Sequence, residues 1–252
     1  MSILQHAKPL TEVLRDERTN PRVRKLLAEI PAIKAFGERH GLKSTTNYTE
    51  YVKLDRPAAV WVVSASERLR FKSKEWSFPF IGHVPYLGWF DLKNAQDFAR
   101  ELEGEGLDVD LRGAGAYSTL GWFRDPILSS MIAHGEEARG ELVNVVLHES
   151  VHATFYIAGQ AYFNESLASF VADRLTDSYF NLSDAADPGK EADFLVYRKA
   201  REQSKFAEKK FRDTYLRLKE LYDSAKSDQE KFTGKAGILK GLREELQLKR
   251  DV

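Results

Sequence analysis

Two histidines stand four residues apart in the segment LVNVVLHESVHATFYI, and a glutamate directly follows the first of them. On a helix, positions i and i+4 lie on one face, with their side chains about 6 Å apart. His148 and His152 can therefore bring two imidazole nitrogens to one ion, at Zn–N distances of about 2.0–2.1 Å. Glu149 lies about 100° round the helix, where it can reach a water on the open side of the ion. This H-E-x-x-H pattern predicts a metal site with an adjacent general base.

A catalytic zinc site needs a third protein ligand, and Glu165 is the candidate. The helix that carries the histidines is expected to cover residues 136–158 and to stop at Gly159. Asn164 is expected to cap the next helix, which places Glu165 in its first turn. From His152 the first helix climbs roughly 10 Å, and six further residues span up to about 20 Å when extended. The connection is therefore long enough to return Glu165 to the histidines.

Two histidines and a carboxylate leave one coordination position open, as catalytic zinc sites do. The same set also suits iron oxygenases, but the glutamate beside the first histidine favours hydrolysis, because an oxygenase needs no base there. The simpler alternative is a pair of buried, hydrogen-bonded histidines without a metal. Against that alternative, Glu149 would lie unpaired in a strongly apolar helix, at a desolvation cost of several kcal/mol that a cation offsets.

The expected chemistry is hydrolysis of a peptide bond by zinc-activated water. Zinc lowers the pKa of its water towards about 7, and Glu149 would carry the proton to the leaving amine. A separate donor should stabilise the oxyanion, and Tyr117 is the candidate, with a packed core tyrosine as the alternative. Asp173, eight residues after Glu165, is a candidate partner for the second nitrogen of a ligand histidine; a solvated helix carboxylate is the alternative.

The composition excludes several other classes of protein. The 252 residues include 38 basic and 38 acidic side chains, so no excess of positive charge suggests nucleic acid as a partner. Cysteine is absent, which excludes thiol catalysis, disulfides and cysteine-rich zinc sites. No stretch approaches the roughly 20 apolar residues of a membrane span. The residues give no prediction of an oligomeric state.

The flanking segments predict an α+β fold with a small mixed sheet, the metal-binding helix pair and a helical C-terminal region. Strands are expected where β-branched and aromatic residues run or alternate, and helices where apolar residues recur at helical spacing. Asp91 is a predicted N-cap, and Asp125 before Pro126 is a predicted helix start. Expected strands cover residues 58–66, 76–91, 107–113 and 115–123; expected helices cover 91–106 and 9–42, the latter broken near Pro21 and Pro31 and ended by Gly41.

Three regions are expected to pack as one domain. They are an N-terminal helical segment (1–56), a catalytic core (57–182) and a C-terminal helical hairpin (183–252). An apolar stripe on the hairpin is expected to pack against the rest of the molecule, and a partner-binding helix is the alternative. The stripe comprises Ala207, Phe211, Tyr215, Leu218 and Tyr222.

The segments HESVHATFYIAGQAYFNESLASFVAD and GAYSTLGWFRDPILSSM resemble a proteobacterial family of zinc aminopeptidases, whose members are similar to gluzincins. The resemblance extends from about Leu10 to Leu221. It implies a zincin-like fold, Zn²⁺ as the cofactor, a peptide substrate, zinc ligation by His148, His152 and Glu165, and Glu149 as the base. By weaker analogy, the AYSTLGWF segment would pair with the substrate as an edge strand.

The chain departs from the family in two respects. Its spacer between His152 and Glu165 is shorter than in better-known gluzincins, and the charged C-terminal end matches poorly. Family members are often lipoproteins, so the resemblance implies a periplasmic or membrane-anchored location. The sequence carries neither an export leader nor a lipidated cysteine, and otherwise a cytoplasmic location is expected.

The leading hypothesis is thus a zinc-dependent peptidase, and more specifically an aminopeptidase acting on short peptides. A catalytically silent zinc protein that binds peptides or a protein partner is the alternative, and a metal-free structural domain is a third. The presence of Glu149 favours the enzyme, because a silent relative has no need of that carboxylate.

Overall fold

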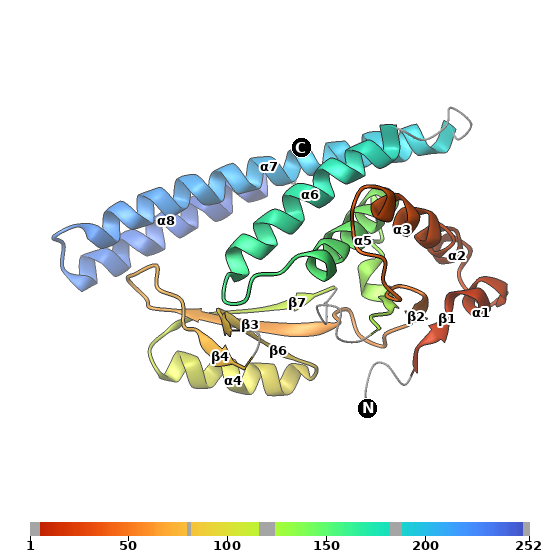
Figure 1. Ribbon diagram of the computed structural model, residues 1–252. Helices are drawn as coiled ribbons and strands as arrows, with labels where there is room; N and C mark the ends of the chain where they lie inside the picture. The colour runs from red at the N-terminus through yellow and green to blue at the C-terminus, as the bar shows by residue number, and fades with distance from the viewer. Residues whose placement is uncertain (1–5, 80–81, 116–123, 182–187, 249–252) are drawn as a thin grey trace.

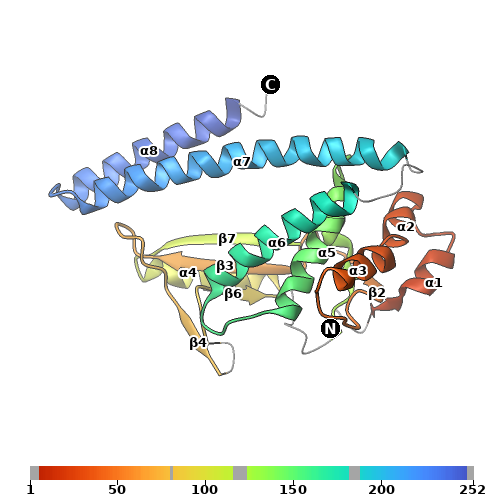
Figure 2. The ribbon, with the colours of Figure 1, turned by 45° about the horizontal axis from the view of Figure 1, so that its top comes forward.

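The computed structural model describes residues 6–79, 82–115, 124–181 and 188–248, arranged as a mixed α+β fold. A helix pair, α5 (Ala138–Thr154) and α6 (Ala161–Asn181), lies at its centre. Short N-terminal helices flank this pair at one end, and a small sheet flanks it at the other (Figure 1). The long C-terminal helices α7 (Pro188–Asp223) and α8 (Asp228–Leu248) cross above both (Figures 1 and 2). The predicted α+β class is confirmed.

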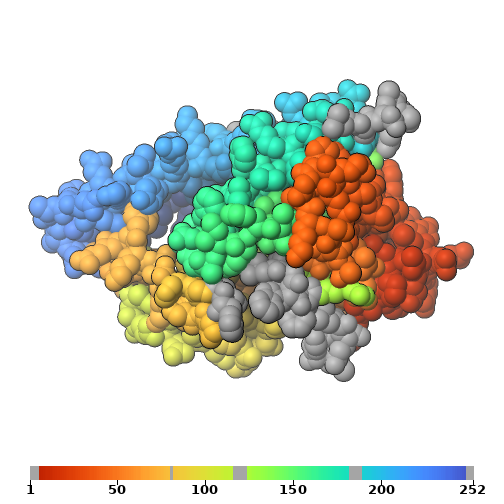
Figure 3. Space-filling view, viewed as in Figure 1, coloured from red at the N-terminus to blue at the C-terminus, as the bar shows by residue number. Residues whose placement is uncertain are grey.

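The N-terminal helices are α1 (Leu10–Arg15), α2 (Pro21–Leu27) and α3 (Ile30–Arg39). The predicted breaks near the two prolines are confirmed, and both prolines stand in the first turn of the following helix, where a missing N–H costs nothing. Gly41 follows the last helix with a φ of +91°. Apolar side chains of α2 and α3 join those of α5 in the main core. Figure 3 shows the N-terminal helices (red to orange) beside α6 on one face of the molecule.

The strands form three small sheets rather than one mixed sheet. The main sheet is antiparallel, in the order β6 (Tyr86–Trp89), β3 (Val60–Ser66), β7 (Asp108–Ala114). Parallel pairing is confined to a second sheet, in which β2 (Glu50–Val52) lies between β1 (Lys8–Pro9) and β8 (Ile127–Leu128). The third is a hairpin of β4 (Trp76–Phe78) and β5 (Gly82–Val84). The strands expected at 58–66, 76–91 and 107–113 are confirmed; most of the one expected at 115–123 lies outside the described residues.

The predicted helix start at Asp125 is wrong. The short strand β8 and a 3-10 turn, Ser129–Met131, follow it instead. The Asp125 side chain is buried, and one of its carboxylate oxygens accepts a hydrogen bond from the Asn47 Nδ2 at 3.4 Å. In return, the backbone N–H of Asp125 donates to the Asn47 Oδ1 at 3.1 Å. The aspartate therefore ties two distant segments together rather than capping a helix.

Helix α4 (Leu92–Gly104) covers one face of the main sheet and leaves the other face open towards α6. As predicted, Asp91 caps this helix, accepting from the Asn94 N–H at 2.9 Å. The packed face joins Val63 and Ala65 to apolar residues of α4. Because side chains alternate along a strand, the residues between them point to the opposite face. The sheet therefore presents a polar face to the centre of the molecule.

The C-terminal hairpin of α7 and α8 is confirmed. Helix α7 lies close against α5 at Gly140, where a Cβ atom would stand only 2.3 Å from the ring of the buried Tyr197. The predicted stripe is partly covered, since Leu218 is buried and the ring of Tyr215 lies 4.4 Å from that of Phe71. Phe211 stays exposed. None of the helices in the described part of the chain combines the length and apolar character needed to cross a bilayer.

Candidate metal centre

Helix α5 ends earlier than the sequence predicts. It stops at Thr154, and Phe155 is already extended, with φ −144° and ψ 125°. The Thr154 hydroxyl donates to the Ser150 carbonyl at 2.6 Å and accepts from the Lys43 N–H at 2.9 Å. These bonds fasten the last turn to the N-terminal region. Gly159, predicted as the helix stop, lies instead in the connecting loop with a φ of +75°.

The prediction that Asn164 caps the second helix is also wrong. Helix α6 begins at Ala161, so Asn164 lies inside it, 2% exposed. Its side chain reaches back to the loop, accepting from the Ile157 N–H at 3.0 Å and donating to the Ile157 carbonyl at 2.7 Å. The amide thus satisfies both backbone groups of one loop residue. Because Glu165 is the next residue along, this clasp fixes the position of the third candidate ligand.

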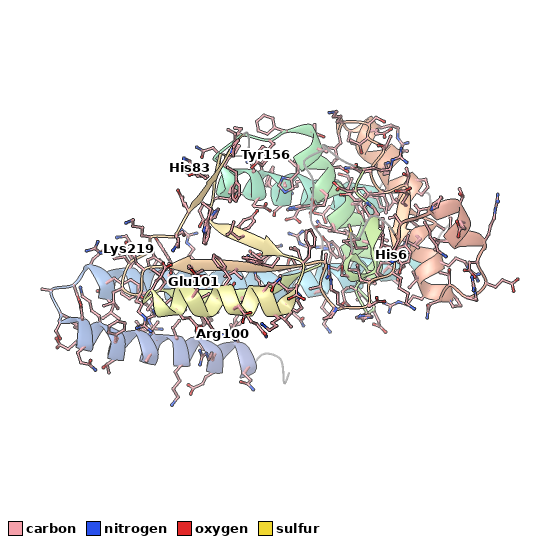
Figure 4. The ribbon with its side chains drawn as sticks, turned by 90° about the horizontal axis from the view of Figure 1, so that it is seen from below. His6, His83, Arg100, Glu101, Tyr156 and Lys219 are labelled. Carbon is pink, nitrogen blue, oxygen red and sulfur yellow. The ribbon has the colours of Figure 1, made fainter. Side chains whose placement is uncertain are left out.

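A second contact holds the same loop from the side of the β4–β5 hairpin. A Cβ atom on Gly82 would lie 2.6 Å from the backbone nitrogen of Gly159, so the two backbones touch. Figure 4 shows His83 of the hairpin and Tyr156 of the loop close together. Gly82 has a φ of +83°, a conformation that glycine adopts without strain. The hairpin and the loop therefore form one wall beside the histidines.

The three predicted ligands come together in the structure. The Nε2 atoms of His148 and His152 are 3.1 Å apart, and the ring planes are inclined at 80°. One oxygen of Glu165 lies 3.4 Å from the Nε2 of His148, and the other lies 3.6 Å from that of His152. Tetrahedral ligands at about 2.1 Å from zinc are separated from one another by roughly 3.4 Å. The group can therefore hold a metal ion.

The environment of the three side chains suits a site with one open side. His152 is 6% exposed, whereas the side chain of Glu165 is 52% exposed. Hydrogen bonds from His148 and His152 lower the pKa of Glu165 to about 2. Burial lowers the pKa of His152, but its hydrogen bond with Glu165 and the charges of Glu149 and Glu165 outweigh burial and raise it. In the metal-free protein, an ion pair thus takes the place of the cation.

This ion pair predicts a pH-dependent stability of the metal-free protein. A depressed carboxyl pKa stabilises the fold above the ordinary value near 4.5, whereas a raised histidine pKa stabilises it below the ordinary value near 6.5. Glu165→Gln should therefore lower the melting temperature of the metal-free protein near pH 5.5 by about 1–2 °C, because the pair is half exposed. The difference should shrink at pH 9 and at pH 2. Calorimetry of both proteins at the three pH values checks this, and an equal difference at pH 5.5 and pH 9 contradicts it.

Glu149 lies behind the ligands and is almost fully buried. It is 8% exposed, and its Oε2 atom has no hydrogen-bond partner among the described residues. Burial raises the pKa of Glu149, and the charges of His148 and His152 oppose this rise. A carboxylate with a raised pKa that lies beside a candidate metal site is suited to accept a proton.

A cavity of about 760 Å³ opens beside the metal ligands and has Glu165 in its lining. Its floor is the open face of the main sheet, where Ser64 pairs with Tyr86 on one side and with Asp110 on the other. Directly opposed residues share a face, so these three side chains form one row. Tyr162 of α6 lines the cavity too, and its hydroxyl lies 3.1 Å from the Ser73 Oγ of the β3–β4 connection. The volume is in the range that ligand sites occupy.

Two further predictions about the site have different outcomes. Tyr117 lies in residues 116–123, outside the described part of the chain, and its role stays a prediction. Asp173 accepts from the Asn144 Nδ2 at 3.1 Å and forms an ion pair with Arg201 of α7. These bonds commit the Asp173 carboxylate to the packing of α5, α6 and α7.

The comparison with known sequences assigns a family. The whole chain, residues 1–252, matches the family described as "Putative aminopeptidase". The protein belongs to this family. No curated protein and no solved structure shows a match to the chain. Membership of an aminopeptidase family implies a peptide substrate.

For this member of the aminopeptidase family, we expect Asn164 to control the metal site through the loop. Asn164→Asp places an oxygen against the Ile157 carbonyl, so a buried hydrogen bond becomes a repulsion. The melting temperature should fall by about 3–8 °C, and metal affinity should fall by about 10–100-fold. Gln160→Glu, the same kind of change at an exposed position of the same loop, should alter neither quantity appreciably. Differential scanning calorimetry and metal competition measure both, and equal effects of the two variants contradict the role of the clasp.

Proposed function

We propose that this protein is a zinc-dependent aminopeptidase with a zincin-like active site. The observation that carries the proposal is the convergence of His148, His152 and Glu165 at the edge of an open cavity, with Glu149 buried beside them. Two imidazoles and one carboxylate, with an open position, form the ligand set of catalytic zinc hydrolases. The family description supports a peptide as the substrate.

The side chains would divide the work as follows. His148, His152 and Glu165 would hold the zinc, which when bound supplies a Lewis acid for the scissile carbonyl and acidifies a water. Glu149 would accept the proton of the attacking water and deliver it to the leaving nitrogen. Its buried position supports this role, because a carboxylate shielded from bulk water is more basic than an exposed one.

Among the described residues, Tyr86 is a second candidate for the donor that stabilises the oxyanion, besides Tyr117. Tyr86 shares the cavity with Glu165. Burial raises the pKa of Tyr86, and the charges of Glu165, Tyr156 and Glu149 raise it further, so its hydroxyl lies close to the reacting groups and stays protonated. A protonated phenol can donate a hydrogen bond to a developing negative charge.

Asp110 is the candidate group for the substrate's free amine. Two aspartates of β7 line the cavity, but Asp108 already forms ion pairs with Lys235 and, at 3.7 Å, with Arg68. Asp110 has a looser contact, 3.8 Å from the Arg112 Nε, and both of these side chains are more than half exposed. Its charge is therefore the more available one for an incoming ammonium group.

Peptide hydrolysis by the zinc-loaded protein tests the proposal. We expect turnover of short peptides with a free amino terminus, loss of turnover in chelator, and little turnover of the same peptides after N-acetylation. Asp110→Asn should lower kcat/KM for free-amine peptides by about 10–100-fold, because a charge-assisted hydrogen bond is lost. Asp108→Asn, on the same face of the same strand, should change it by less than about threefold.

The outcomes separate the possible functions. Zinc binding without turnover of any peptide would indicate a catalytically silent peptide-binding protein. Equal turnover of free and acetylated peptides would indicate an endopeptidase. Equal losses in the two aspartate variants would overturn the role of Asp110.

A further inference from the structure

Tyr48 adopts a backbone conformation that side chains rarely occupy. Its φ is +63°, and no other non-glycine residue in the described part of the chain has a positive φ. For a bulky residue this is an outlier, which persists only where the surroundings hold it. The Tyr48 N–H donates to the Asp125 carbonyl at 2.7 Å, and the side chain of Asn47 pairs with Asp125 through two more hydrogen bonds. The strained residue is thus clamped to the segment that enters β8.

The clamped loop runs behind the metal centre. Five residues before Tyr48, the Lys43 N–H bonds to Thr154, two residues after the ligand His152 on α5. The ring of Tyr48 is part of the main core, together with Val146 and Leu147 of the same helix. Burial raises the pKa of Tyr48 well above its ordinary value, and the charges of Glu149 and Asp125 raise it further. The tyrosine therefore lies on the inner side of α5, near the Glu149 carboxylate.

Two complementary polar atoms lack partners in this region. Tyr48 is 2% exposed, and its hydroxyl makes no hydrogen bond to another described residue. The Oε2 atom of Glu149 is in the same situation. A phenol hydroxyl donates and a carboxylate oxygen accepts, so each atom offers what the other needs. Buried polar groups in native proteins are almost always paired, directly or through an enclosed water.

We propose that Tyr48 is a positioning residue, whose hydroxyl donates a hydrogen bond, directly or through one water, to Oε2 of Glu149. This inference rests on the proposed role of Glu149 as the general base. With Oε2 held from behind, the carboxylate can turn only Oε1 towards the metal cavity. The clamped loop fixes where the hydroxyl points, which gives the strained backbone at Tyr48 a purpose. Tyr48 itself touches neither substrate nor metal.

A double-mutant cycle on the metal-free protein tests the contact without any reference to activity. Urea unfolding is measured for the wild type, Tyr48→Phe, Glu149→Leu and the double variant. If the hydroxyl serves Glu149, Tyr48→Phe lowers the unfolding midpoint of the wild type. In the Glu149→Leu background it leaves the midpoint unchanged or raises it, because it then removes an unpaired hydroxyl. Tyr51→Phe, on the adjoining strand β2, should produce the same shift in both backgrounds.

An equal shift by Tyr48→Phe in both backgrounds would overturn the proposal, because the hydroxyl would then serve Asp125 or no carboxylate at all. A native Tyr48→Phe protein is expected, since the ring and its packing remain. If that variant fails to fold, the intact protein still decides the matter: the nuclear magnetic resonance signal of a slowly exchanging Tyr48 hydroxyl should shift in Glu149→Leu. A signal that is unchanged by Glu149→Leu would likewise contradict the contact.

Kinetics of the zinc-loaded variants supply the functional readout. Tyr48→Phe should lower kcat by about tenfold with KM changed by less than about twofold, and zinc content should stay at one per chain. A purely structural role would not lower kcat alone. Unchanged kcat together with a coupled unfolding cycle would place the contact in folding only and reject its catalytic purpose. If no variant, including the wild type, hydrolyses peptides, the proposed function fails, while the unfolding cycle still decides the contact.

Discussion

Glu149→Gln is expected to reduce kcat by about a thousandfold while one zinc per chain remains bound. Glutamine has the shape of glutamate but cannot take the proton from the attacking water. The buried position of Glu149 makes the loss severe, because no other carboxylate is in place to substitute for it. Since Glu149 is not one of the three converging ligands, zinc content should not change. Steady-state hydrolysis of a free-amine peptide, with zinc measured on the same samples, checks both parts.

Glu141→Gln is the matched control for this prediction. Glu141 lies on the same helix, two turns earlier, and is also partly buried; burial and the charge of Glu137 raise its pKa. It stands outside the group of metal ligands, so its loss should leave kcat within about twofold. If Glu149→Gln keeps more than a tenth of the wild-type kcat, Glu149 is not the base.

His152→Ala is expected to lower zinc affinity by roughly a thousandfold or more, and turnover with it. His152 is the most buried of the three ligands, so neither water nor a neighbouring side chain can easily replace its nitrogen. Competition against a chromophoric chelator measures the affinity. His134→Ala, which removes an exposed histidine just before α5, should leave the affinity unchanged. Wild-type affinity in the His152 variant would show that zinc binds elsewhere.

The metal ligands could be predicted from the sequence because their geometry is local. His148 and His152 owe their proximity to helix periodicity alone, which a sequence displays directly. Glu165 required only that the connection be long enough to return, and the structure brings it within 3.6 Å of both histidines. The helix ends were predicted less well, since Thr154 stops α5 through a bond to Lys43, more than a hundred residues away in the chain.

The role of Asn164 was misjudged for a related reason. Asparagine before a helical run usually caps it, and nothing in the sequence reveals that a carbonyl and an N–H of Ile157 lie within its reach. A short run of polar and glycine residues between the two helices was the available signal, because a loop of that kind leaves backbone groups in need of partners.

The floor of the cavity and the residue behind the base could not be predicted at all. Tyr86, Ser64 and Asp110 form a row only because of the strand register, which sets residues far apart in the chain opposite one another. Tyr48 meets the metal helix through a loop held by Asp125. Such contacts depend on tertiary packing, and no local pattern around Tyr48 or Asp110 encodes them.

X-ray absorption at the zinc edge, on the zinc-loaded wild type and on Glu165→Gln, tests the central claim most directly. The claim is that α5 and α6 together hold one zinc through two imidazoles and one carboxylate. For the wild type we predict one zinc per chain, with two imidazole nitrogens at about 2.0–2.1 Å and oxygen ligands completing a low coordination number. The spectrum should change in Glu165→Gln. A six-coordinate spectrum without imidazole scattering, or one that Glu165→Gln leaves unaltered, would contradict the account.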